Sequence, residues 1–156
     1  MHRIYGTVIV ALGLFLITAC GVQKAALTED QVPSAVKQTF HEKFPAVQNP
    51  GWSLKSDQNY EAEFAVQQVE MAVKIDPAGK WLETETAIPP ATLPPAVQNT
   101  MAAQFKDYQL IETQTLLRAG AARSNYELHL DNGKQVVKAE FSPEGALLTQ
   151  SAKPKP

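Results

Sequence analysis

Residues 60–82 read YEAEFAVQQVEMAVKIDPAGKWL, and their alternation dictates an antiparallel sheet. Apolar and polar side chains alternate through residues 60–66 and again through 69–75, which predicts two strands, each with one apolar face and one wet face. Residues 76–79, Asp-Pro-Ala-Gly, have proline and glycine at the second and fourth positions of a tight turn. A further strand is therefore expected at residues 81–88.

The same plan occurs twice in the chain. Residues 75–82, IDPAGKWL, return as residues 141–148, FSPEGALL, at an offset of 66. Residues 32–36, VPSAV, return as residues 93–97, LPPAV, at an offset of 61. The second copy thus has five more residues (66 − 61) between its two matching segments, which we place within residues 118–123. Such a repeat predicts two copies of one structural unit.

Each copy opens with a pattern typical of a helix. Pro33 and Pro94 suit a first helical turn, where a missing N–H costs nothing, and Pro45 disfavours helical geometry in the residue before it. Apolar residues spaced by four form one stripe in each copy: Val32, Val36, Phe40 and Phe44 in the first, and Leu93, Val97, Met101 and Phe105 in the second.

Strands are also expected in the second copy. Residues 126–130 alternate with Tyr, Leu and Leu inward, and residues 137–141 continue that alternation. Between them, residues 131–134 contain the Asn-Gly pair of a two-residue hairpin. Residues 52–55 and 110–117 are candidates for a leading strand in each sheet.

The predicted fold class is α+β, with two tandem units that each consist of a helix followed by three to four antiparallel strands. A unit of about 60 residues buries only roughly 60% of its unfolded surface, so we expect the two sheets to join with both helices on one side. Residues 151–156 are polar and suggest a frayed end. The expected segments are a signal peptide (1–19), a tether (20–31), unit 1 (32–88), an extended proline-rich linker (89–92), unit 2 (93–150) and a disordered tail (151–156).

Cys20, the single cysteine, closes an apolar N-terminus. Residues 4–17 carry no charge, follow Arg3 and lead into the small residues Thr18 and Ala19, which is the layout of a secretory signal. Residues 17–20, Ile-Thr-Ala-Cys, resemble a bacterial lipobox, which implies cleavage before Cys20 and acyl chains, palmitate among them, on it. A transmembrane anchor is the competing interpretation, but residues 4–19 give 16 positions where a spanning helix needs roughly 20. A buried structural cysteine is the other alternative.

We therefore expect a lipid-anchored protein of the cell envelope. Gly21 occupies the position where Asp often retains lipoproteins at the inner membrane of enteric-type bacteria, so the resemblance favours the outer membrane, facing the periplasm. Loss of residues 1–19 removes Arg3 and no acid, which moves the formal charge from −2 to −3. This weak acidity gives no reason to expect nucleic acid as a partner.

Catalytic and metal-binding sets are hard to assemble from this sequence. The histidines after residue 19 are His41, expected on an exposed helix flank, and His129, expected on a wet strand face beside Glu127 and Asp131. No serine or cysteine nucleophile lies beside His129 in the local sequence, and two distant histidines do not make a metal site. We expect no enzyme activity, no metal and no cofactor.

Strand alternation instead predicts a polar surface. Its mixed charges should lie on the sheet face away from the helices, where they form a candidate platform for a protein or peptide partner; an ordinary solvated sheet face is the alternative. The candidate partner-binding residues are Glu61, Glu63, Lys74, Glu127, His129, Lys138 and Glu140.

The chain resembles the PepSY-like family of bacterial envelope proteins, also described as β-lactamase-inhibitor-like, over residues 32–150. Trp52 has no counterpart in the second copy, and Ser142 replaces Asp76, so the match has departures. The resemblance rests on Val32-Pro33, Ala35-Val36, Phe40, Phe44-Pro45, Trp52, Tyr60, Ile75-Asp76, Gly79 to Leu82 and Glu85, and on Leu93-Pro94, Val97, Phe105, Tyr126, Phe141, Gly145 and Leu148.

Members of this family are secreted or lipid-anchored and consist of tandem helix-plus-sheet units, so the resemblance implies the same for this chain. The family has no known catalytic residues to carry over. The inhibitor relatives hold a partner protein on a broad sheet face, and the family name suggests peptidase regulation. We therefore predict a non-catalytic envelope lipoprotein that binds a protein or peptide, with restraint of a peptidase as the sharper version. A carrier of small apolar ligands in the periplasm and a structural envelope spacer are the alternatives.

Overall fold

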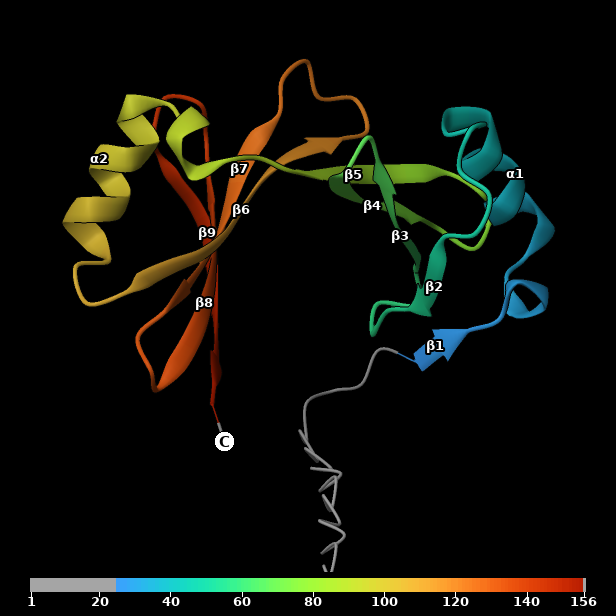
Figure 1. Ribbon diagram of the computed structural model, residues 1–156, viewed down its shortest axis with the longest axis horizontal. Helices are drawn as coiled ribbons and strands as arrows, with labels where there is room; N and C mark the ends of the chain where they lie inside the picture. Colours follow the sequence, from blue (N-terminus) through green and yellow to red (C-terminus); the bar gives the residue numbers. More distant parts are fainter. Residues whose placement is uncertain (1–24, 156) are drawn as a thin grey trace, which may run out of the picture.

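The computed structural model describes residues 25–155, which form one nine-stranded antiparallel sheet and two α-helices (Figure 1). The strands pair in chain order, β1 to β9, so each strand neighbours the one before it in sequence. The elements are β1 (Ala25–Leu27), α1 (Ser34–Lys43), β2 (Gly51–Leu54), β3 (Tyr60–Val66), β4 (Val69–Ile75), β5 (Trp81–Ala87), α2 (Pro95–Gln104), β6 (Gln109–Arg118), β7 (Asn125–Asp131), β8 (Gln135–Phe141) and β9 (Leu147–Pro154). The α+β class is confirmed; the signal peptide and Cys20 lie outside the described residues.

Both helices cover the same face of this sheet, although they lie at opposite ends of it in Figure 1. Val73 of β4 pairs with Thr84 of β5, and Thr84 pairs with Leu117 of β6. Four residues back along β6, on the same face, Thr113 pairs with Leu128 of β7. Val73 lies in the core under α1 and Leu128 in the core under α2, so β5 and β6 join two cores on one side of a continuous sheet.

The two cores are built by the helical stripes that the sequence predicts. Val36 and Phe40 of α1 and Val97 of α2 are completely buried. The core under α1 contains Val32, Val36, Phe40, Trp52, Ala62, Val73 and Ile75, and the core under α2 contains Leu93, Val97, Phe105, Leu128, Leu130, Val137, Ala139 and Phe141. The apolar periodicity thus identified the buried faces correctly.

Two glycine turns bring each helix close to its sheet. Gly79 and Gly145 have φ angles of +88° and +84°, which side chains rarely adopt. A Cβ on Gly79 would lie 2.8 Å from the carbonyl oxygen of Ala35, and a Cβ on Gly145 would lie 2.5 Å from that of Ala96. Each glycine carbonyl also accepts a hydrogen bond from a helix threonine: Thr39 Oγ1 to Gly79 (2.5 Å) and Thr100 Oγ1 to Gly145 (2.8 Å). Both positions therefore require glycine.

The end of the chain is a strand rather than a disordered tail. Residues 151–154, expected to be frayed, belong to β9. The pairing of β9 with β8 extends from Pro154 opposite Gln135 to Leu147 opposite Phe141. The prediction was wrong because it used the polarity of the side chains alone. A strand at the edge of a sheet is held by backbone hydrogen bonds, and polar side chains on it remain in contact with solvent.

Two other segments expected to be irregular also contain regular structure. Within the expected linker, residues 90–92 form a 3₁₀ turn, in which Thr92 Oγ1 donates to the carbonyl of Pro89 at 2.7 Å. Within the expected tether, residues 25–27 form β1 and residues 29–31 form another 3₁₀ turn. The short strand β1 pairs with β2, so the sheet begins before the expected unit 1.

The two-residue hairpin occurs at a different place from the one predicted. Between β3 and β4, Gln67 and Gln68 have φ angles of 51° and 68°, and the flanking pair Val66–Val69 closes a two-residue turn. At Asn132-Gly133, only the glycine has a positive φ. The Asn-Gly pair therefore marks a turn correctly but gives the wrong turn length, because the last pair of the ladder, Asp131 opposite Val136, leaves residues 132–135 between its two members.

Candidate interaction surface

All the charged residues singled out in the sequence lie on the sheet face opposite the helices, which we call the polar face. Across β3 to β6, Glu61 pairs with Lys74, Lys74 with Glu83, and Glu83 with Arg118. On β7 and β8, Glu127 lies opposite Glu140, and His129 lies opposite Lys138 in the same register. Alternation therefore placed these residues on one face, and the continuous sheet brings both groups together.

Three acids on this face are buried, which corrects the expectation of a wet stripe. Glu61, Glu127 and Glu140 expose only 5%, 5% and 6% of their surface. A buried carboxylate needs a cation or several hydrogen-bond donors. Lys55 Nζ lies 2.8 Å from Glu61 Oε2, although the sequence alone did not single out Lys55. These acids hold the sheet face together and are not themselves exposed contacts.

Glu127 lies at the centre of one group of hydrogen bonds. Its Oε1 accepts hydrogen bonds from Gln114 Nε2 at 2.6 Å and from Lys138 Nζ at 2.7 Å, and it lies 3.3 Å from His129 Nε2. Burial alone would raise the pKa of this carboxyl, but the hydrogen bonds from His129, Lys138 and Gln114 and the charge of Lys138 lower the pKa to about 2. Glu127 is thus a fixed negative charge.

Glu140 lies at the centre of a second group. Arg118 binds both of its carboxylate oxygens, one of them at 2.9 Å, and Asn125 Nδ2 donates to it at 2.6 Å. The hydrogen bond from Arg118 is the main cause that lowers the pKa of Glu140. Arg118 Nε also lies 3.3 Å from Glu83 Oε2, and Lys74 Nζ lies 2.6 Å from Glu83 Oε1. These pairs link β4, β5, β6 and β8 into one network, so the face is preorganised.

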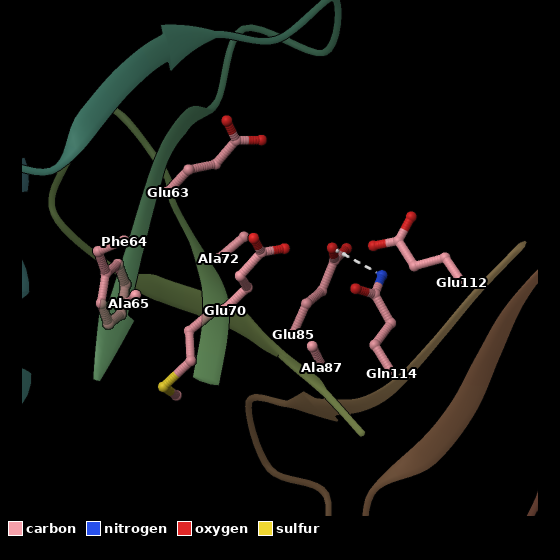
Figure 2. A pocket seen from close by; sticks show the side chains of 10 residues that line it. Glu63, Phe64, Ala65, Glu70, Ala72, Glu85, Ala87, Glu112 and Gln114 are labelled. Atoms are coloured by element: carbon pink, nitrogen blue, oxygen red, sulfur yellow. Dashed lines mark hydrogen bonds between the residues drawn. The ribbon is translucent and has the colours of Figure 1, made fainter. Parts of the chain in front are cut away.

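The polar face is hollowed near the β3–β4 hairpin. We call this hollow of about 440 Å³ the acidic hollow (Figure 2). Glu85 and Gln114 lie side by side in it, with Gln114 Nε2 donating to Glu85 Oε2 at 2.9 Å. Its lining contains no lysine, arginine or histidine; it consists of Glu63, Phe64, Ala65, Glu70, Met71, Ala72, Glu85, Ala87, Glu112 and Gln114.

The acidic hollow concentrates negative charge over a floor of small residues. Ala72 and Ala87 lie on the same face as Glu85, because strand alternation places them two residues from Lys74 and from Glu85 respectively. Burial is the main cause that raises the pKa of Glu85, and the negative charges of Glu127, Glu61 and Glu83 raise it further, while Lys138 opposes them. The hollow is therefore electrostatically complementary to a cation.

A second hollow of about 330 Å³ continues from the acidic hollow along the same face. Glu85 contributes to both hollows. The second hollow is lined by Lys74, Glu83, Glu85, Leu116, Arg118, Glu127, Lys138, Glu140, Thr149, Gln150 and Ser151. The sequence analysis missed Glu83, Glu85, Gln114 and Arg118 because nothing local showed that β5 and β6 would pair. The signal was present, since these residues alternate with apolar or hydroxyl side chains along their strands.

Within the described part of the chain, His129 lies between two carboxylates. Both ring nitrogens of His129 face carboxylates: Nδ1 lies 2.8 Å from Glu112 Oε2, and Nε2 faces Glu127. Asp131, expected beside this histidine, instead pairs with Lys155. Within residues 25–155 no group of three or more histidine, cysteine, aspartate or glutamate side chains has an arrangement that could hold a metal ion. Among the same residues, no helix is both long and apolar enough for a membrane crossing.

Residues 25–155 form a nine-stranded sheet with both helices on one face and a hollowed, charged opposite face, which defines an α+β protein with an open sheet surface. The family described as "Putative beta-lactamase-inhibitor-like, PepSY-like" matches residues 58–149, and the chain belongs to this family. No curated protein matches the chain at a significant level.

Solved structures show the same fold at low sequence identity. A BLIP-like protein from Bacteroides fragilis is 23% identical, with a TM-score of 0.63 over 80% of this chain and 89% of that one. A DUF2874 family protein from Bacteroides uniformis is 19% identical, with a TM-score of 0.68 over 78% and 89%. A structure from Bacteroides eggerthii, described among "putative periplasmic proteins", is 21% identical, with a TM-score of 0.67 over 78% and 88%. These similarities concern the fold.

Proposed function

We propose that this chain is a non-catalytic lipoprotein of the cell envelope that binds a protein or peptide partner on its polar face. The observation that carries the proposal is the hollowed polar face, which neither helix covers and whose charges are fixed by cross-strand pairs. A face that is already ordered loses little conformational entropy on binding. Restraint of an envelope peptidase is the sharper form of this proposal, and it rests only on what the PepSY name of the family suggests.

The acidic hollow favours a partner that presents a lysine or arginine side chain on an exposed segment. A basic side chain could lay its methylenes over the alanine floor and its charge among the carboxylates. An apolar ligand would receive no matching groups there and would cover carboxylates without pairing them. The hollow therefore favours a protein partner over the alternative of an apolar-ligand carrier.

Localisation and domain organisation belong to the same proposal. Residues 17–20 support lipidation at Cys20 after cleavage of residues 1–19, with the outer membrane, facing the periplasm, favoured by Gly21. Tandem duplication is supported by the offset of 66 between residues 75–82 and 141–148 and by the matching glycine turns against α1 and α2.

Charge reversal on the rim of the acidic hollow tests the binding face. The full chain, purified in detergent from its native envelope, is used to recover partners with Glu70→Lys and Glu112→Lys combined. Glu42→Lys on α1 is the matched control, because Glu42 is exposed and bonded only to Gln38 among the described contacts. We expect partner recovery to fall at least tenfold with the double variant alone. Unchanged recovery would remove the polar face from the proposal.

Lipidation has an independent test. Replacement of Cys20 by serine removes the acyl attachment site, so the protein should move from the membrane fraction to the soluble fraction. Continued membrane association of Cys20→Ser after a high-salt wash would show that the anchor lies elsewhere.

A further inference from the structure

The sheet has one long open edge, formed by β9. The strand order ends at β9, which pairs with β8 and with no other strand of the described residues. Every residue of β9 after Leu147 is exposed. The opposite edge, β1, has only three residues. An exposed edge presents unpaired N–H and C=O groups, so β9 is the place where this sheet can accept another strand.

The register identifies which backbone groups of β9 are unpaired. Lys155 donates its N–H to the carbonyl of Lys134 at 2.9 Å, so this is a hydrogen-bonded pair. Hydrogen-bonded and non-hydrogen-bonded pairs alternate in an antiparallel ladder. The residues Gln150 and Ala152 are therefore in non-hydrogen-bonded pairs with β8, and their N–H and C=O groups point to the open edge. Pro154 also lies in a non-hydrogen-bonded pair with β8. The N–H that proline lacks would therefore have pointed to the open edge, and the hydrogen bonds between β9 and β8 are unaffected.

A hollow of about 430 Å³ lies beside this edge on the helix face, and we call it the edge hollow. Phe105 and Tyr108, which contact each other edge to face at 5.6 Å, contribute to its lining, and Gln135 Nε2 donates to the Tyr108 hydroxyl. The lining contains no charged residue; it consists of Gln104, Phe105, Tyr108, Gln135, Val137, Gln150, Ser151 and Ala152. Gln150 and Ala152 thus offer backbone groups to the edge and side chains to the hollow.

The molecule itself shows that the corresponding edge accepts a strand. β5 is the fourth strand after α1, as β9 is the fourth strand that follows α2. At the repeat offset of 66, Thr84 and Thr86 of β5 correspond to Gln150 and Ala152 of β9. In β5 these two positions are covered by Leu117 and Thr115 of β6. In β9 the equivalent positions have no partner strand among residues 25–155.

We propose that β9 binds an extended peptide segment of a partner protein as a tenth, antiparallel strand. Main-chain groups of Gln150 and Ala152 pair with the peptide, and one uncharged, large apolar side chain of the peptide enters the edge hollow against Phe105 and Tyr108. This combination of an open edge and a neighbouring side-chain pocket is the general arrangement by which sheets recognise extended peptides. β9 also borders the second hollow of the polar face, but the edge hollow lies on the helix face, and the proposal does not depend on a partner at the polar face.

Selection from a displayed library of short random peptides against the full chain in detergent tests this site. Ala152→Pro removes an outward N–H while keeping the β8 ladder, and Gln104→Trp fills the edge hollow from its rim. Lys153→Ala on the same strand is the matched control, because Lys153 is exposed and lines neither the edge hollow nor the hollows of the polar face. Glu112→Lys controls for binding at the polar face. Unfolding midpoints establish that each variant is folded before binding is compared.

We expect enriched peptides to share a large apolar residue at one position. Their affinity should fall at least tenfold with Ala152→Pro and with Gln104→Trp, and stay within twofold for both controls. No enrichment, or binding that Ala152→Pro leaves unchanged, would overturn the proposal. A concentration-dependent dimer of the free protein that Ala152→Pro converts to monomer would also overturn it, because the occupant of the edge would then be a second copy of this chain.

Discussion

Replacement of Gly145 by alanine should destabilise the protein far more than the same replacement at Gly133. The two glycines have the same φ of +84°, so both variants place an alanine in a left-handed conformation at a cost of roughly 1–2 kcal/mol. At Gly133 no atom lies within 4 Å of the new Cβ. At Gly145 the new Cβ would lie 2.5 Å from the carbonyl oxygen and 2.6 Å from the carbonyl carbon of Ala96, which are backbone atoms.

Backbone atoms of α2 cannot move aside as a flexible side chain can, so the helix itself must shift. Overpacking of this kind costs about 1–3 kcal/mol. It also strains the hydrogen bond of 2.8 Å from Thr100 Oγ1 to the carbonyl of residue 145. We therefore expect Gly145→Ala to cost about 2–5 kcal/mol in total, against about 1–2 kcal/mol for Gly133→Ala.

Urea denaturation followed by tryptophan fluorescence and far-UV circular dichroism measures this difference. The midpoint should fall for both variants, and the fall should be at least twice as large for Gly145→Ala at an unchanged slope. Equal destabilisation would refute the reasoning, since it would mean that φ alone sets the cost and that the approach of α2 to the turn contributes nothing.

Three further changes have expected outcomes. Gln67→Asn combined with Gln68→Gly should stabilise the protein by roughly 1–2 kcal/mol in urea denaturation, because both positions have positive φ; the same measurement would contradict this if stability fell. Ser53→Ala should be neutral or stabilising by about 1 kcal/mol in thermal unfolding, because the Ser53 hydroxyl is buried without a hydrogen-bond partner among the described residues, and clear destabilisation would reveal an unseen partner. The pKa of Glu127 is lowered from 4.5 to about 2, so the stabilising effect of its charge is complete above pH 4.5 and is lost as the pH falls toward 2. The stability of Glu127→Gln, measured as a function of pH, should therefore lack roughly 2 kcal/mol of this acid dependence, after allowance for solvent screening. An unchanged profile would exclude Glu127 as the source of the dependence.

The local sequence pattern predicted helices and strands well wherever the burial of one face had produced that pattern. The alternation in residues 60–66 and 69–75 matches β3 and β4 at both ends, and the spacing of Val36 and Phe40 identified the buried face of α1. The prediction of a disordered tail at residues 151–156 was wrong because polar side chains do not indicate whether the backbone pairs at a sheet edge. The sequence located the turn at Gln67 and Gln68 between two strands but did not indicate its positive φ angles, since register can force a residue without a turn preference into that conformation.

The candidate surface was only partly visible in the sequence. Alternation placed Glu61, Lys74, Glu127, His129 and Lys138 on one face, as the register confirms. Their role as a partner-binding surface stays a prediction. The burial of Glu127 and Glu140 could not be foreseen, because their partners Lys138 and Arg118 come from other strands.

By itself, the sequence determined the period of each strand, the apolar stripe of each helix and the glycine turns, because each depends on residues that are close along the chain. Tertiary structure alone decided that β5 pairs with β6, since nothing local specifies which sheet edges meet. That pairing brings Arg118 of β6 to Glu83 of β5, and the same arginine reaches Glu140 of β8. Charges that alternation could only assign to a face thus became one network, and β9 became the edge that remains open.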